Sequence, residues 1–368
     1  MIKYIYQNQQ WPDFYWDKEK ILSLLADVKL AKGILFGKMV YIGFDLQEKA
    51  DLTIITQDIV KTSEIEGELL NPKEVRSSVA KKLGIIIENS IDSKRNVDGI
   101  VDMTINAIYK RNDKLTQERL FGWHNSLFPK GYSGLHKIRV AGFRDDSGGP
   151  MQVVSGPIGK EIVHYQAPSA EKLNLEMDRF LDWLNKDDSH DKIVKSAIAH
   201  LWFVTLHPFD DGNGRIARAI TDMLLAQSDD NNKRFYSLSS QIQQDKNNYY
   251  NILEKTQKGN LDITDWLEWF LNCLLLAIQN SEKVLSDIFQ KHKFLQKILT
   301  QNLQARQINI IKKMFEDFQG KLTTSKYAKL CKCSQDTANR DIDILVKNKI
   351  LLKQGDGRNT HYIINNDL

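Results

Sequence analysis

The sequence predicts a mainly α-helical protein with one small β-hairpin and a separate C-terminal domain. Apolar residues recur three and four apart along most of the chain, which is the spacing of one helix face. Between Ala141 and Pro168 glycine, proline and β-branched residues replace that pattern and predict two short strands around a turn. A chain of 368 residues is too long for one typical domain, so we expect two or three domains.

The composition is that of an ordinary globular protein. Hydrophobic residues make up 42% of the chain and charged residues 27%, and the net charge of +4 is too small to indicate nucleic-acid binding by itself. The three cysteines, Cys273, Cys331 and Cys333, form no disulfide framework and no zinc spacing. The first residues do not look like a signal peptide, and no apolar run is long enough to cross a bilayer. We therefore expect a cytoplasmic protein without a membrane segment.

An N-terminal helical module is expected over residues 1–95. Pro12 prevents an earlier helix, and Asp17 can cap a helix that begins at Lys18. Asn71 and Pro72 end a later helix of this module.

That later helix, over about residues 52–70, carries an acid on its apolar stripe. Helical spacing aligns Glu66 with Thr62 and Ile59. A carboxylate buried in such a stripe is costly without a partner, so we expect Glu66 to meet a cation. We expect its neighbours Glu64 and Glu68 to be solvated acids on the helix surface. The same interpretation stays open for Glu66.

A core domain is expected over residues 96–280, and its most informative segment is His207-Pro-Phe-Asp-Asp-Gly-Asn-Gly-Arg-Ile-Ala-Arg218. Apolar helices are predicted on both sides of this segment. The turn Asp211–Gly214 would expose backbone N–H groups at the start of the second helix, which is an anion-binding arrangement. Arg215 and Arg218 would add forked donors on one helix face, and the Asp211 carboxylate is a hard ligand for Mg²⁺.

This segment resembles the signature of the Fic family, His-x-Phe-x-Asp/Glu-Gly-Asn-Gly-Arg-x-x-Arg, with every fixed position present. The alternative is an ordinary helical corner in which the histidine is a packing residue. That alternative explains the glycines and the asparagine. It does not explain the presence of two arginines and the aspartate. The opening of the chain and the motif Thr62-x-x-x-Glu66-Gly67 also resemble Fic proteins that carry an inhibitory helix before the core. The resemblance implies a Fic-type helical core in which the hairpin is a flap.

The resemblance implies a protein adenylyltransferase that uses ATP and Mg²⁺ to modify a Ser, Thr or Tyr hydroxyl. It makes His207 the general base, Asp211 the metal ligand and Glu66 the inhibitor that pairs with Arg218. Enzymes with this glutamate can also remove AMP, so de-AMPylation stays open. The residues that it places at the nucleotide are Gly212, Asn213, Gly214, Arg215, Arg218, the flap residues Val163, His164, Tyr165 and Gln166, and, at the adenosine end, Tyr249 and Gln257. The alternatives are a structural hairpin for the flap residues, a core aromatic for Tyr249 and a surface amide for Gln257.

A helical linker over residues 281–303 is expected to lead to a domain over residues 304–368 that resembles a winged helix. Between positions 321 and 363 nine basic residues stand against four acidic ones. This permits DNA binding by the predicted recognition helix, and binding to protein or dimerisation is an equal alternative. The residues expected to face DNA are Gln335, Thr337, Asn339 and Arg340.

Two other functions stay open at this stage. The chain could be a DNA-binding transcriptional regulator whose Fic core only senses nucleotide, which operator binding without AMP transfer would select. It could also be a Fic enzyme with another phosphate-containing donor, such as a phosphocholine or UMP source. The target protein, which includes the chain itself, and a homodimeric state are further open partners.

Overall fold

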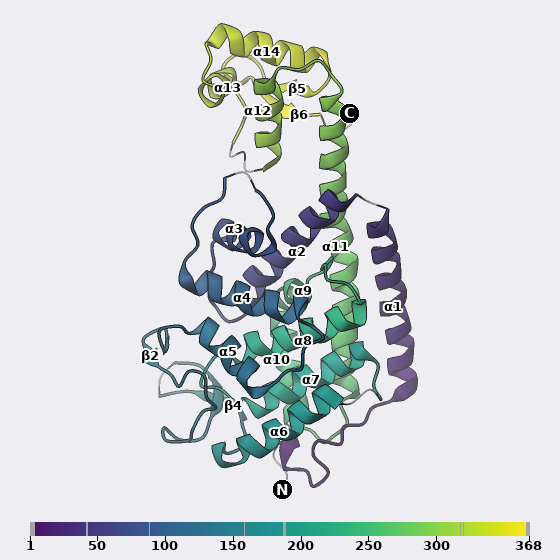
Figure 1. The fold of residues 1–368 in the computed structure, drawn as a ribbon, viewed down its shortest axis with the longest axis vertical. Coiled ribbons are helices and arrows are strands. Elements are labelled where there is room, and N and C mark those ends of the chain that lie inside the picture. The colour runs from purple at the N-terminus through teal and green to yellow at the C-terminus, as the bar shows by residue number, and fades with distance from the viewer. Residues whose placement is uncertain are drawn as a thin grey trace. The chain divides into compact units, whose positions relative to one another are not determined.

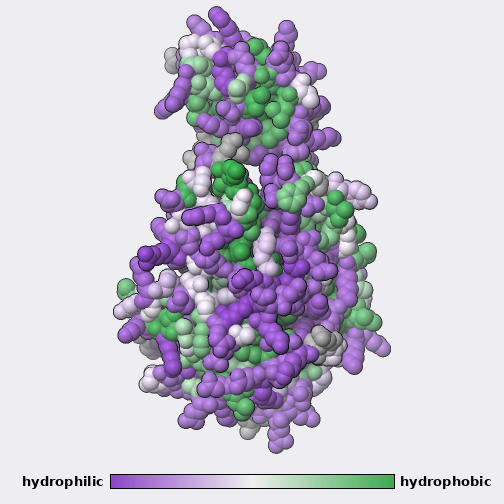
Figure 2. Space-filling model, in the orientation of Figure 1, coloured by the Kyte–Doolittle hydropathy of each residue, from purple (hydrophilic) through white to green (hydrophobic). Residues whose placement is uncertain are grey.

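The computed structural model confirms the mainly helical fold class (Figure 1). It describes residues 4–41, 43–87, 89–157, 159–186, 189–316, 318 and 320–365, without the side chains of Glu316 and Arg358. The chain divides into two compact units, Met1–Lys283 and Val284–Leu368. Hydrophilic side chains cover most of the face that Figure 2 shows, with smaller apolar patches among them. No helix of the described ranges combines the length and the apolar character that crossing a membrane requires.

The first unit begins with a short 3-10 helix η1 (Ile5–Gln7), followed by α1 (Lys18–Val40), α2 (Phe44–Ile65) and α3 (Pro72–Leu83). Asp17 caps α1 as expected, because its carboxylate accepts from the N–H groups of Glu19 and Lys20. Helix α2 begins before the predicted residue 52 and ends before residue 70.

The early end of α2 has a local cause. Gly67 adopts a left-handed φ of 82°, and its N–H donates to the carbonyl of Glu64 at 3.0 Å. The N–H of Glu68 donates to the carbonyl of Ser63, also at 3.0 Å. These two bonds form a Schellman motif, which stops the helix and turns the chain. Glu66 is therefore the C-cap residue of α2 and not an interior residue.

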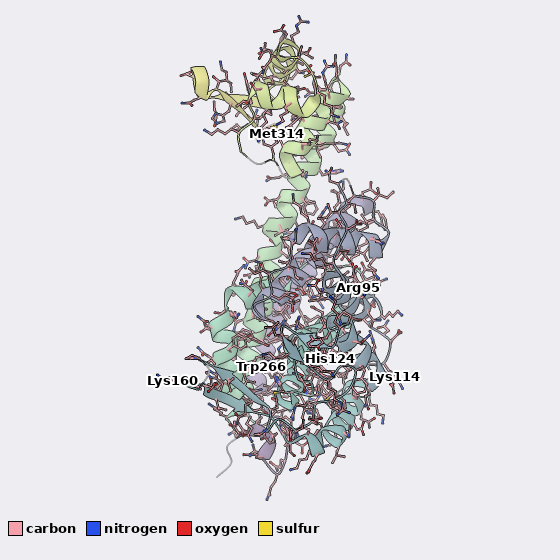
Figure 3. The ribbon with its side chains drawn as sticks, turned by 90° about the vertical axis from the view of Figure 1, so that its left-hand side faces the viewer. Arg95, Lys114, His124, Lys160, Trp266 and Met314 are labelled. Carbon is pink, nitrogen blue, oxygen red and sulfur yellow. The ribbon has the colours of Figure 1, made fainter. Side chains whose placement is uncertain are left out.

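The centre of the first unit is the pair α7 (Lys192–Leu206) and α8 (Asn213–Asp229), which pack against each other. Every residue of α7 from Ile193 to Leu206 is buried, which explains its nearly continuous apolar sequence. The surrounding helices are α4 (Arg95–Tyr109), α5 (Gln117–Leu127), α6 (Ala170–Lys186), α9 (Leu238–Gln244), α10 (Lys246–Gln257) and α11 (Thr264–Leu299). Trp266 of α11 is fully buried and donates to the carbonyl of Ala197 at 2.9 Å, which fixes α11 against α7 (Figure 3).

The predicted β-hairpin is present as β3 (Gln152–Ser155) and β4 (Ile162–Gln166), which pair antiparallel. Its register joins Gln152 to Gln166 and Ser155 to Ile162, with a bulge between Val153 and Val154. Ile158, in the connecting turn, lies outside the described residues. A second, shorter hairpin of β1 (Tyr132–Ser133) and β2 (His136–Lys137) was not predicted.

The second unit contains α12 (Ala305–Glu316), α13 (Thr324–Cys331), α14 (Gln335–Lys347), β5 (Leu351–Gln354), a 3-10 helix η2 (Gly357–Asn359) and β6 (His361–Ile364). Asp341 of α14 is 2% exposed and accepts from Arg306, Gln307 and Tyr327, so one carboxylate ties three helices together. The order of three helices and a hairpin is the order expected of a winged helix. Residues 284–299 of the expected linker belong to α11, and Phe294 and Ile298 pack in the core of this unit.

Candidate active site

His207 stands at the C-terminal end of α7 in an unusual backbone conformation. It is the C-cap residue with φ 49° and ψ 57°, and its N–H donates to the carbonyl of Phe203 at 3.0 Å. Its ring Nδ1 lies 3.3 Å from the carbonyl oxygen of Val204. A carbonyl only accepts, so Nδ1 carries the proton and Nε2 keeps its lone pair. The left-handed cap therefore presents a basic nitrogen where the helix stops.

The surroundings of His207 keep its imidazole neutral. The pKa of this imidazole is lowered to about 4, chiefly by burial and also by the charge of the Arg144 guanidinium. The bond to Val204 and the charges of Glu66 and Asp211 raise the pKa, but less than burial lowers it. His207 is therefore deprotonated at neutral pH, the form that a general base requires.

The turn between α7 and α8 is held by Asn213. Its Oδ1 accepts from the N–H of Phe209 at 3.0 Å, and its Nδ2 donates to the Phe209 carbonyl at 2.7 Å. The side chain is 2% exposed. One amide N–H and the amide oxygen of Asn213 therefore brace the turn, and the expected contact of this amide with phosphate stays a prediction.

Gly212 lies where no other residue fits. Its φ is 82°, which strains any side chain. A Cβ there would also lie 2.8 Å from Cε2 of Phe128. The turn can therefore pass this close to α5 only because position 212 has no side chain.

Asp211 offers a half-exposed carboxylate beside the turn. Its Oδ1 accepts from the N–H of Gly212 at 2.5 Å, and its Oδ2 accepts from the hydroxyl of Ser133 and lies 3.9 Å from Nη2 of Arg215. The described residues contain no group of three or more His, Cys, Asp or Glu side chains that could hold a metal ion by themselves. A cation at Asp211 would thus need further ligands from a substrate.

The N-terminus of α8 is an anion site that the chain itself fills. The N-cap residue of α8 is Gly212, which has no side chain to cap the first turn. A Cβ at Gly214 would overlap Oε1 of Glu66 and lie 3.1 Å from its Cδ, so the Glu66 carboxylate stands directly over Gly214. The positive end of the helix dipole and the missing side chain at position 214 suit this negative charge.

Arg218 pairs with the same carboxylate, as the sequence predicted. Its Nη2 donates to Oε1 of Glu66 at 2.6 Å and to the carbonyl of Thr62 at 3.0 Å, and its Nε donates to Oγ1 of Thr62 at 2.5 Å. Burial alone would lower the pKa of Arg218, but the Glu66 charge and hydrogen bond leave it raised. Its Nη1 is buried without an acceptor among the described residues. One strong donor of this guanidinium is therefore unused.

Arg215 also has an acidic partner, which the sequence did not predict. Its Nη1 donates to Oε2 of Glu68 at 2.8 Å, and its guanidinium carbon lies 5.1 Å from the centre of the Phe128 ring. Glu64 and Glu68 are both partly exposed, as expected of solvated acids, but each also has a cationic partner. Glu64 pairs with Lys61 at 2.6 Å.

The flap residues split into an anchored and an outer set. Tyr165 is 1% exposed and donates its hydroxyl to the carbonyl of Thr205 at 2.7 Å, so its side chain anchors the hairpin in the core. His164 lies between Oγ of Ser155, at 2.6 Å, and Oε2 of Glu254, at 2.7 Å. Gln166 accepts from Gln152 on β3, and Val163 is 39% exposed. Strand alternation explains why Tyr165 points inward while its neighbours do not.

The structure gives Tyr249 and Gln257 supporting roles. Tyr249 is 2% exposed, and its hydroxyl lies 2.9 Å from Nε2 of His200, so it is a core aromatic; its expected place beside adenosine stays a prediction. Gln257 is 6% exposed, and its Nε2 lies 3.4 Å from the carbonyl of Val204. It thus shares with His207 the carbonyl that sets the tautomer, and it is not a surface amide.

Two residues that sequence reasoning missed hold the turn in place. Arg144 is 3% exposed and donates through Nε to the carbonyl of His207 at 2.8 Å. His124 stacks on Phe209 with ring centres 4.2 Å apart, and its Nε2 lies 3.1 Å from the carbonyl of Asp211. Figure 3 shows His124 in the interior of the first unit. A histidine near the end of α5 was the only signal for this role.

Together the fold and the site define a helical corner that places a neutral histidine beside an anion-binding helix N-terminus. Residues 114–225 match the model of the Fic/DOC family, and residues 4–85 match that of a domain of unknown function, DUF4172. The chain therefore contains a Fic/DOC domain, in agreement with the resemblance of its signature.

Curated relatives carry the name Protein adenylyltransferase Fic. The one from Culex quinquefasciatus is 27% identical over 232 residues, which are 61% of this chain and 41% of the relative. The one from Nematostella vectensis is 23% identical over 221 residues, which are 59% of this chain and 46% of the relative. The chain thus covers less than half the length of these relatives.

Two solved structures show the same fold. A Fic family protein from Desulfovibrio desulfuricans G20 has a TM-score of 0.53 and 19% identity, with coverage of 95% of this chain and 97% of that one. A Fic domain containing signaling protein from Bacteroides thetaiotaomicron VPI-5482 has a TM-score of 0.50 and 17% identity, with coverage of 73% and 97%.

Proposed function

We propose that this protein is an adenylyltransferase that transfers AMP from ATP to a Ser, Thr or Tyr hydroxyl of a protein. One observation carries the proposal. The Glu66 carboxylate lies over Gly214 and on Arg218, so the site already binds an oxyanion where a nucleotide phosphate would bind. His207, with its free Nε2, ends the preceding helix close enough for the Glu66 charge to affect its pKa. The relatives named adenylyltransferases support the same activity.

The chemistry follows from these positions. The target hydroxyl oxygen attacks the α-phosphorus of ATP while its proton passes to Nε2 of His207. The bond from the α-phosphorus to the oxygen that bridges to the β-phosphate breaks, and pyrophosphate leaves with that electron pair. The N–H groups at the start of α8 stabilise the charge that develops on the α-phosphate, and Arg215 stabilises the charge on the leaving phosphates.

The residues around Asp211 fit a Mg²⁺ ion that arrives with the nucleotide. Mg²⁺ in such sites is bound by one or two carboxylates together with substrate phosphates. Asp211 supplies one carboxylate, and its side chain is 41% exposed. The ion would neutralise phosphate charge there.

Glu66 inhibits this reaction in the resting chain. While its carboxylate holds Arg218 and covers Gly214, the terminal phosphate of ATP has no place to bind. Thr62 strengthens the inhibited state because both its hydroxyl and its carbonyl accept from Arg218. The same carboxylate could orient a water against a modified hydroxyl, which is the basis for proposing de-AMPylation as a second activity.

The flap offers the target a backbone edge. A target segment that adds as a strand would gain main-chain hydrogen bonds with little demand on its sequence. The exposed apolar side chains of the hairpin, Val154 at 48%, Ile162 at 62% and Val163 at 39%, would contact it.

Mass spectrometry after incubation with ATP and Mg²⁺ tests the proposal. We expect a mass gain of one AMP on a hydroxyl side chain of the chain itself or of an added protein. The variant His207→Ala should show no gain. A gain with UTP or a phosphocholine donor, and none with ATP, would select the alternative donors.

The second unit supports a separate proposal, DNA binding through α14. Three of the four residues expected to face DNA are exposed on this helix: Gln335, Asn339 and Arg340. The fourth, Thr337, is hydrogen-bonded through its hydroxyl and its N–H to the hydroxyl of the cap residue Ser334. Fluorescence anisotropy with duplex DNA at increasing salt would test it, and Arg340→Ala should weaken binding. If this unit binds a protein or dimerises instead of binding DNA, the anisotropy should not change when duplex DNA is present.

A further inference from the structure

Arg215 is held by a carboxylate that lies outside both motifs of the chain. Its side chain is 8% exposed, and the partner Glu68 is 37% exposed, so the pair sits at the edge of the site. The N–O distance of 2.8 Å is that of a charge-assisted hydrogen bond. In the proposed reaction Arg215 serves the leaving phosphates. The resting chain thus engages this arginine before any nucleotide arrives.

The position of Glu68 is built from two directions. The Schellman motif at the end of α2 fixes its backbone through the bond from its N–H to Ser63. Nδ2 of Asn96, in the first turn of α4, donates to Oε1 of Glu68 at 3.0 Å. Its second oxygen, Oε2, is then left for Arg215. The carboxylate is therefore placed between two elements and is not a freely rotating surface group.

The two acids divide the two arginines between them. Glu66 contacts Arg218 and covers Gly214, while Glu68 contacts Arg215, and no hydrogen bond within the described ranges crosses between the pairs. The Arg215 guanidinium has donors to spare, because its Nε is buried without an acceptor among the described residues. An incoming phosphate oxygen can take over this guanidinium if Glu68 releases it.

We propose that Glu68 is a second inhibitory acid, which competes with the β- and γ-phosphates of a nucleotide for Arg215. This inference rests on the proposed nucleotide-binding function. Removing Glu66 alone frees Arg218 and leaves Arg215 engaged, so full opening requires both acids to move. Because Glu68 competes only with the terminal phosphates, it selects against ATP and ADP and is neutral toward AMP.

Isothermal titration of the full chain with ATP and with AMP tests this. Glu68→Gln should tighten ATP binding up to about 5-fold, as expected for loss of one partly exposed ion pair, and should leave AMP binding unchanged. Asn96→Ala should shift ATP binding in the same direction, because it loosens Glu68 without changing any charge. The control is Glu64→Gln, which removes the same charge from a pair with Lys61. In Glu66→Gln/Glu68→Gln the gain in ATP affinity should exceed that of either single variant, because both arginines are then released.

Each other outcome overturns a different statement. Equal ATP affinity in Glu68→Gln and Glu64→Gln, with a gain in Glu66→Gln, would remove Glu68 from inhibition and leave the proposed function standing. Equal gains for ATP and AMP in Glu68→Gln would contradict competition at the terminal phosphates. ATP binding to none of the variants, with circular dichroism showing folded protein, would overturn the proposed function and this inference with it.

Discussion

A methyl group at position 214 should close the anion site while leaving the helix intact. Gly214 is in helical conformation, so Gly214→Ala costs nothing in the backbone and gains about 0.5 kcal/mol of helix propensity near the helix end. The new Cβ takes the space of the Glu66 carboxylate, whose side chain is 30% exposed and can swing away. The bond to Arg218 at 2.6 Å is then lost.

The net cost follows from these terms. A hydrogen bond between charged groups contributes about 1.5–3 kcal/mol, and the exposure of Glu66 places this one at the lower end. Subtracting the helix gain leaves about 1 kcal/mol of destabilisation. For a unit of this size that lowers the melting temperature by roughly 2 °C.

The assay is thermal unfolding with and without saturating ATP and Mg²⁺. Glu66→Gln should show a smaller drop without nucleotide, because its amide oxygen can still accept from Arg218 although the negative charge is lost, and a larger stabilisation by ATP than the unaltered chain. Gly214→Ala should show no stabilisation by ATP, because the methyl occupies the phosphate position. If Gly214→Ala were stabilised by ATP as strongly as Glu66→Gln, phosphate would not bind at the start of α8, and the reasoning would be refuted.

Four further results are expected. His207→Ala should stop transfer of label from α-³²P-ATP while ATP still binds, and continued transfer would exclude His207 as the base. Glu66→Gly should raise auto-modification about 10-fold, the equivalent of about 1.4 kcal/mol, and an unchanged rate would mean that the pair does not inhibit. Burial lowers the pKa of His124 to about 4 and that of His200 to about 3. Below about pH 6.5 these histidines are therefore protonated in the unfolded chain but stay neutral in the folded chain. The free energy of unfolding, measured by urea titration, should therefore fall by about 2 kcal/mol per histidine between pH 7 and pH 5. The fall should be smaller in His200→Gln. Equal free energies of unfolding at both pH values would contradict the burial of these rings. Truncation after Lys283 should keep auto-modification, whereas truncation after Leu303 should promote aggregation by exposing Phe294 and Ile298, as light scattering would show.

The helices and the turn between them could be predicted because their information is local. The apolar runs on both sides of the segment His207–Arg218 predict buried helices, and α7 and α8 confirm them. The glycines and arginines of the turn are neighbours in sequence, so a short-range rule was enough to place them on one helix start. The hairpin was predicted for the same reason, from glycine and β-branched residues in one stretch.

The side-chain roles within the site were harder to predict. Asn213 was expected at phosphate, and it braces the turn through the Phe209 backbone. Tyr249 and Tyr165 were expected at the nucleotide, and both are buried with their hydroxyls bonded inside the core. The spacing of residues in the sequence predicts which face of a helix or strand each one occupies. The group that it contacts on that face depends on how the helices and strands pack.

The sequence by itself determined that two helices meet at a turn with a histidine, open backbone donors and two arginines, because secondary structure follows short-range sterics and periodicity. The pairing of Glu66 with Arg218 was expected from the resemblance, whereas only the tertiary structure decided that Glu68 holds Arg215. Glu66 reaches Arg218 and Glu68 reaches Arg215 across more than 140 residues of sequence, after a Schellman turn and the packing of α2 on α8 have set their positions. Such pairings depend on the packing of whole elements, where the burial of an apolar face outweighs any local preference of the charged residue.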